Sequence, residues 1–302
     1  MWHLDPPAHD PRDSWETCTS ASRDTLNNAG LGSRLRQAAD IAQKAAETYR
    51  TAAQSRTLHD LDPAAFKIDG IPDRTVSGIV YESGMRDGPG RTIYDELMDA
   101  PEDDLCPLCR HSLATELDHV MPKADYPALC VAPQNLVPVC GICNRTKNSR
   151  APREADKVLL HPYFDRAGHA NWLDATAIPG SQGRLVYHVT APPAWDSVFA
   201  DRVAHHFAFF DLATRYGSRA NNVLTGMRLL FAEQLADTGP AGLRTHLEKL
   251  ARSHFAHDLN SWAAVAYRAW AADDAFCEGA FGPTPQPVRS DGGRRGRRLP
   301  AP

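Results

Sequence analysis

The sequence lacks an excess of positive charge, a long apolar run and an export signal. Its 302 residues carry a formal net charge of −4, which excludes a basic field over the whole surface of the kind that marks many nucleic-acid-binding proteins. No stretch approaches the roughly 18–20 apolar residues that cross a bilayer, and the polar, proline-rich start has no secretory pattern. We therefore expect a cytoplasmic protein with no membrane contact, in which any contact with nucleic acid comes from a local patch.

The cysteines do not suit a disulfide framework, because there are seven of them in a chain with no export signal. Four form two Cys-x-x-Cys pairs, Cys106 with Cys109 and Cys140 with Cys143. Two such turns complete a tetrahedral four-sulfur shell for Zn²⁺. A closed shell leaves no open coordination position, so the predicted zinc is structural and replaces the core that a short segment cannot build. The alternatives to a zinc site are four unrelated thiols or a redox-active Cys-x-x-Cys pair. The presence of two Cys-x-x-Cys pairs, one on each side of the same segment, argues against the redox pair.

The N-terminal third predicts helices after an irregular start. Polar and turn-forming residues dominate 1–33, so we expect a loosely ordered segment there. Apolar residues then recur at helical spacing and predict one packed helix. This stripe consists of Leu35, Ala38, Ala42, Ala45, Tyr49 and Ala52. A short strand is expected at Thr75–Tyr81, and a second helix at Arg91–Met98.

The C-terminal half predicts a hairpin followed by helices. Residues 171–176 and 184–190 flank a turn-rich stretch, and three or four packed helices are expected between Phe199 and Gly279, with a break at Gly239-Pro240. The whole chain is expected to be α+β: mostly helical, with a small zinc module and one hairpin. The expected organisation is a loose N-terminal segment (1–33), a helical region (34–100), a nuclease module (101–165), a helical C-terminal domain (166–282) and a flexible basic tail (283–302).

The segment between the cysteine pairs carries a second pattern. It reads Asp118-His119-x-x-Pro, then Asn135-Leu, and Cys143 is followed by Asn144. With the cysteines, this order resembles the cysteine-bearing branch of the HNH endonuclease family, which has a ββα-metal fold. The resemblance covers roughly 101–150. This chain has an asparagine, Asn144, where the family name has its last histidine, and the His-Asn-Asn variant occurs in the family.

The chemistry of phosphodiester hydrolysis fits these residue types. An imidazole titrates near neutral pH, so His119 is the expected general base. Asp118 and Asn144 supply oxygens for one divalent ion, and hard ligands of this kind suit Mg²⁺ or Mn²⁺. By the resemblance, Asn135 fixes the loop and orients the base. The residues expected to contact nucleic-acid phosphate are Lys123, Arg145 and Lys147.

Two structural expectations accompany this site. Neighbouring side chains on a regular strand point to opposite faces, so a bend or bulge is expected at Asp118-His119. The segment His161–Asp165 is expected to pack against the module, with a contribution to the active site as the alternative.

The sequence therefore predicts a metal-dependent endonuclease that cleaves DNA. A non-catalytic zinc treble-clef that binds nucleic acid or protein, and an RNA-directed or homing-type nuclease, are the alternatives. The large helical flanks suggest an effector of a bacterial anti-phage or restriction-like system, with an ATPase or sensor subunit as partner and homo-oligomer formation possible.

Overall fold

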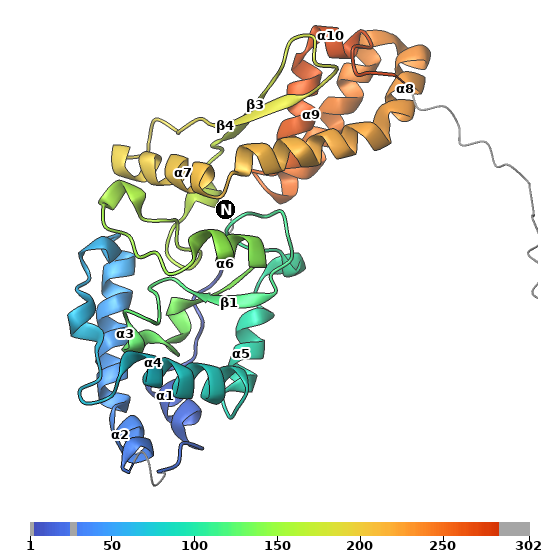
Figure 1. Ribbon diagram of the computed structural model, residues 1–302. Coiled ribbons are helices and arrows are strands. Elements are labelled where there is room, and N and C mark those ends of the chain that lie inside the picture. Colours follow the sequence, from blue (N-terminus) through green and yellow to red (C-terminus); the bar gives the residue numbers. More distant parts are fainter. Residues whose placement is uncertain (1–2, 25–28, 284–302) are drawn as a thin grey trace, which may run out of the picture.

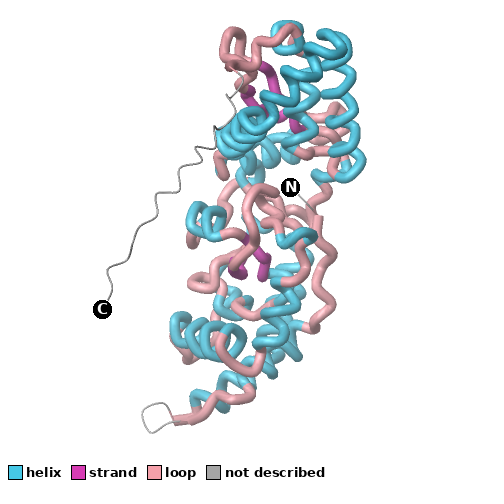
Figure 2. The backbone as a smooth tube through the Cα atoms, turned by 90° about the vertical axis from the view of Figure 1, so that its right-hand side faces the viewer, coloured by secondary structure: helices cyan, strands magenta, loops and turns pink. Residues whose placement is uncertain are grey.

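The computed structural model describes residues 3–24 and 29–283. These residues are mostly helical and include two antiparallel sheets of two strands each, so the fold is α+β as predicted. Helices from the N-terminal third, a central module (residues 101–165) and the C-terminal helices follow one another along an elongated molecule (Figures 1 and 2). No helix among the described residues is both long and apolar enough to cross a membrane. The predicted basic tail lies, from residue 284 onward, outside the described residues.

The N-terminal layer begins with a helix that the sequence did not predict. Helix α1 (Pro11–Thr19) starts at Asp10, whose carboxylate accepts hydrogen bonds from the amides of Arg12 and Asp13. Its Trp15 is fully buried and donates to the carbonyl oxygen of Leu35. The expectation of a loosely ordered segment is wrong for this stretch, because a nine-residue helix held by one tryptophan shows little periodicity.

The rest of this layer surrounds the predicted amphipathic stripe, whose six members are all buried. The helices are α2 (Leu31–Gln37), α3 (Ala39–Gln54), α4 (Asp73–Val76), the π-helical segment η3 (Ser77–Arg86) and α5 (Arg91–Met98). The strand expected at Thr75–Tyr81 is wrong: the β-branched residues there also have helical spacing, and Val76 and Val80 are both buried on one face. Gly84 permits η3 to approach α1, because a Cβ at this position would collide with the carbonyl oxygen of Cys18.

The C-terminal layer combines the predicted hairpin and helices. Strands β3 (Leu173–Ala177) and β4 (Leu185–Val189) pair antiparallel. The helices are α7 (Ser197–Phe209), α8 (Leu212–His257), α9 (Trp262–Ala272) and α10 (Asp274–Cys277). The predicted break lies inside α8, where Gly239 has a φ of 73° and Pro240 has no amide hydrogen to donate.

The segment His161–Asp165 joins the three layers. The His161 Nε2 atom lies 2.7 Å from the Tyr49 hydroxyl of α3, and the Tyr163 hydroxyl donates to the carbonyl oxygen of Leu136 at 2.8 Å. Buried Asp165 forms a bidentate ion pair with Arg202 of α7. These contacts are the packing role that the sequence suggested for the segment.

Candidate active site and metal centre

The two Cys-x-x-Cys pairs meet in one buried cluster. Ligand atoms of Cys106, Cys109, Cys140 and Cys143 all lie within 4.8 Å of one another. The Cys109 and Cys140 sulfurs are 3.9 Å apart, close to the roughly 3.8 Å between sulfurs of a tetrahedral shell with Zn–S bonds of about 2.3 Å. The cluster can hold a metal ion such as zinc.

Helix α8 contributes two groups to this cluster that sequence reasoning missed. The Arg215 guanidinium donates to the sulfurs of Cys109 at 3.1 Å and Cys143 at 3.4 Å. The Tyr216 hydroxyl donates to the carbonyl oxygen of Cys109 at 2.8 Å. Four thiolates around one divalent ion leave an excess of negative charge, which a guanidinium offsets. Arg215 follows the last cysteine by 72 residues and lies in an ordinary helical pattern, so no local signal identifies it.

The pair Asp118-His119 ends a regular strand. Strand β1 (Glu116–His119) pairs antiparallel with β2 (Leu136–Val139), with Asp118 opposite Val137 and His119 opposite Leu136. The expected bulge is absent from this strand pair, whereas the chain bends directly after it, at Val120 and Met121. Both residues still border one cavity, because the strand ends at His119.

His119 is buried and held by one directional bond. Its Nε2 atom lies 2.8 Å from the carbonyl oxygen of Cys130, and its ring packs edge-on against Tyr81 of η3. A carbonyl oxygen only accepts, so Nε2 carries the proton and Nδ1 keeps its lone pair. Burial lowers the pKa of His119 to about 3, so the ring is neutral at neutral pH and does not titrate near neutrality as the sequence suggested.

Asn135 fixes the loop that supplies this carbonyl group. It is fully buried; its Oδ1 accepts from the Met121 amide at 2.8 Å, and its Nδ2 donates to the carbonyl oxygens of Met121 and Leu129. These bonds join the end of β1 to the residue just before Cys130. This placement is the one that the predicted loop-fixing role requires.

Lys147 occupies a different place from the one predicted. Helix α6 (Gly141–Lys147) ends with this residue, whose ammonium is buried 3.1 Å from Asp118 Oδ2 and 2.6 Å from the His119 carbonyl oxygen. The expected direct contact with nucleic acid is therefore corrected: Lys147 is the counter-ion of Asp118. Burial raises the pKa of Asp118, and the Lys147 ammonium opposes this shift.

The other predicted residues meet around a cavity of about 400 Å³. Its lining includes Asp118, His119, Asn144, Lys123 and Arg145. Sequence reasoning missed the opposite wall, since η3 and α5 are distant in sequence. That wall includes Tyr81, Glu82, Arg86 and Tyr94.

Two of the basic residues that line the cavity, Lys123 and Arg145, differ in their surroundings. Lys123 forms an ion pair with Glu82, and its ammonium lies 4.3 Å from the centre of the Tyr81 ring. Arg145 is exposed in the last turn of α6. The cavity therefore combines three carboxylates (Asp118, Glu82 and Glu116) with a neutral imidazole, amide side chains and basic side chains.

Comparison with known proteins finds a relative from a bacteriophage. No family model matches the chain, and no solved structure matches it. Over 174 residues it is 30% identical to Protein ea31 of Escherichia phage lambda; the match covers 55% of this chain and 58% of ea31. The chain thus spans less than two thirds of this relative's length, and the relative's name states no activity.

Proposed function

We propose that the protein is a metal-dependent HNH endonuclease that hydrolyses phosphodiester bonds in DNA. The observation that carries the proposal is the shared cavity: Asp118, His119 and Asn144 all border it, and the imidazole nitrogen that is not bonded to Cys130 is free to accept a proton. The order β1, β2, α6, with cysteines before β1 and at the start of α6, supports a ββα-metal unit stapled by a structural zinc.

The residues divide the work of hydrolysis. His119 Nδ1 takes a proton from the attacking water, and the Cys130 carbonyl oxygen stabilises the imidazolium that forms. Asn135 keeps that carbonyl in place through the loop. Arg145 offers a guanidinium to a phosphate of the substrate.

The oxygen ligands of the cavity fit a hard divalent ion. Asp118 supplies a carboxylate, which a divalent ion would share with the Lys147 ammonium, and Asn144 adds an amide oxygen. These two residues would hold Mg²⁺ or Mn²⁺, which would neutralise the scissile phosphate and stabilise the leaving 3′ oxygen.

The wider role follows from the sequence. The relative is a phage protein, and this origin is compatible with the proposed part in an anti-phage or restriction-like system. An ATPase or sensor partner and homo-oligomer formation stay predictions from the sequence.

Matched histidine variants test the activity. His119→Ala should lower the rate of Mn²⁺-dependent DNA cleavage by about 10²–10⁴-fold, the usual contribution of a general base. His206→Ala is the control, because His206 is equally buried and its Nε2 lies 2.8 Å from the Leu108 carbonyl oxygen, outside the cavity. The control should lose stability and keep the rate of cleavage once it is folded.

Zinc content and thermal unfolding of both variants show whether each is folded. Equal cleavage by His119→Ala and the wild type would refute the proposed base. A wild-type protein that holds zinc and binds DNA or protein but cleaves nothing would favour the treble-clef binding module instead.

A further inference from the structure

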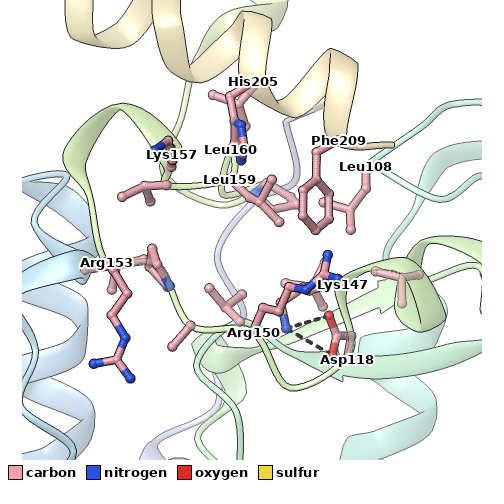
Figure 3. A pocket seen from close by; sticks show the side chains of 18 of the residues that line it. Leu108, Asp118, Lys147, Arg150, Arg153, Lys157, Leu159, Leu160, His205 and Phe209 are labelled. Atoms are coloured by element: carbon pink, nitrogen blue, oxygen red, sulfur yellow. Dashed lines mark hydrogen bonds and ion pairs between the residues drawn. The ribbon is translucent and has the colours of Figure 1, made fainter. Parts of the chain in front are cut away.

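A second cavity lies on the other side of Asp118, between the central module and α7 (Figure 3). It has a volume of about 250 Å³, and Asp118 and Lys147 form part of its wall. The floor is apolar. Its side chains include Leu58, Leu108, Val158, Leu159 and Phe209.

The rim of this cavity is basic. Three cationic side chains, Arg150, Arg153 and Lys157, line it together with the His205 imidazole, against one carboxylate on the rim, Glu154. That carboxylate is paired with Lys157 at 2.6 Å. The Arg150 guanidinium lies 5.5 Å from the centre of the Phe209 ring. The rim therefore favours an anion, while the interior favours a flat apolar group.

A cavity with a basic rim and an apolar interior is suited to bind a nucleotide. A nucleobase offers an apolar face to side chains such as Phe209, and its phosphate suits the arginines. The cavity is smaller than the roughly 300–1,000 Å³ pockets that enclose drug-sized ligands, so it suits one ring system.

We propose that this cavity receives an unpaired base of the DNA strand that is cut, and that the substrate is single-stranded or locally unpaired DNA. The inference rests on the proposed nuclease function and deepens it. Asp118 borders both cavities, so a strand whose phosphate is bound in the first cavity passes close to the second. A base that is paired and stacked in a duplex must leave the stack to enter, which disfavours intact duplex.

Cleavage of three labelled substrates of one sequence tests the preference: a single strand, a duplex with one unpaired base, and a fully paired duplex. The wild type with Mn²⁺ should cut the first two at least about tenfold faster than the third. Phe209→Ala should lower the cleavage rate of unpaired DNA at least about fivefold, because stacking of a base on an aromatic ring contributes binding affinity. Phe255→Ala is the matched control, because Phe255 is another half-buried phenylalanine packed on the same core; it should behave like the wild type.

A second variant fills the cavity without removing a ring. Leu159→Trp should abolish the preference for unpaired DNA, whereas Leu229→Trp, at an exposed position of α8, should keep it. Equal cutting of paired and unpaired DNA by the wild type would overturn the inference and leave the nuclease proposal standing.

Binding separates the two proposals if nothing is cut. Fluorescence anisotropy with non-cleaving His119→Ala should show tighter binding of the single strand than of the duplex, and adding Phe209→Ala should remove this difference. Preferential binding without cleavage by the wild type would refute the nuclease and support the base-binding cavity. Equal affinity for both DNAs would overturn the cavity assignment.

Discussion

Replacing Lys147 by methionine is a quantitative test of the candidate divalent-ion site. The substitution roughly keeps the side-chain length but leaves the Asp118 carboxylate, whose side chain is only 12% exposed, without its ammonium partner. It also removes the donor to the His119 carbonyl oxygen. Removing one member of a buried pair costs about 3–5 kcal/mol, because the remaining charge stays desolvated. We expect the free energy of unfolding to fall by that amount and the melting temperature to fall on the order of 10 °C.

Two companion measurements identify the cause. The double variant Asp118→Asn/Lys147→Met removes both charges, so it should recover most of the lost stability. Mn²⁺ should raise the melting temperature of Lys147→Met more than that of the wild type, because the carboxylate is then free to bind it in the folded state. Urea denaturation and calorimetry measure both effects. A Lys147→Met variant with wild-type stability and a wild-type response to Mn²⁺ would refute the reasoning.

Three further predictions concern zinc, pH and the tail. Purified protein should contain one tightly bound zinc per chain by metal analysis, and Cys140→Ser should be insoluble or unfolded; a well-folded, zinc-free protein would refute this. Burial lowers the pKa of His119 to about 3, of His161 to about 4 and of His206 to about 3. The unfolded chain therefore binds more protons below pH 6.5, so stability should fall as the pH drops from about 6.5 toward 4, and unchanged stability across this window in urea titrations would contradict it. Removing 288–302, with its five arginines, should weaken DNA binding and flatten its salt dependence while leaving the rate at saturating DNA unchanged.

The sequence could predict the parts of the site that are close together along the chain. Cysteine spacing predicted the four-sulfur cluster because two short turns define most of its geometry. The pattern from Asp118 to Asn144 predicted a strand, a loop and a helix, and the structure places these residues on β1, before β2 and on α6. The helix Arg91–Met98 and the C-terminal hairpin are likewise confirmed.

What the sequence could not predict depends on contacts between distant segments. Arg215 at the cysteine cluster and Tyr81 beside His119 lie on helices whose local pattern only indicates packing. The sequence pattern of Lys147 is that of an exposed basic residue at the end of a helix, and only the fold shows that it is buried in an ion pair with Asp118. Strand alternation correctly placed Asp118 and His119 on opposite faces, but the end of the strand, not a bulge, lets both border the cavity.

The alternation of the small sheet also explains how four-residue strands are stable and why both helical layers matter to the site. Leu117 and Leu136 belong to the hydrophobic core of the N-terminal layer, whereas Val137 and Val139 belong to that of the C-terminal layer. Each face of the sheet is thus covered by a different layer, and β2 is buried throughout. His119 shares its face with Leu117 and packs on the N-terminal layer, while the opposite face adjoins the cavity beneath α7. The N-terminal layer therefore sets the environment of the proposed base, whereas both layers line the second cavity, since Leu58 and Val158 belong to the N-terminal core and Phe209 to α7. A change in how either layer packs would alter the proposed chemistry without touching a catalytic residue.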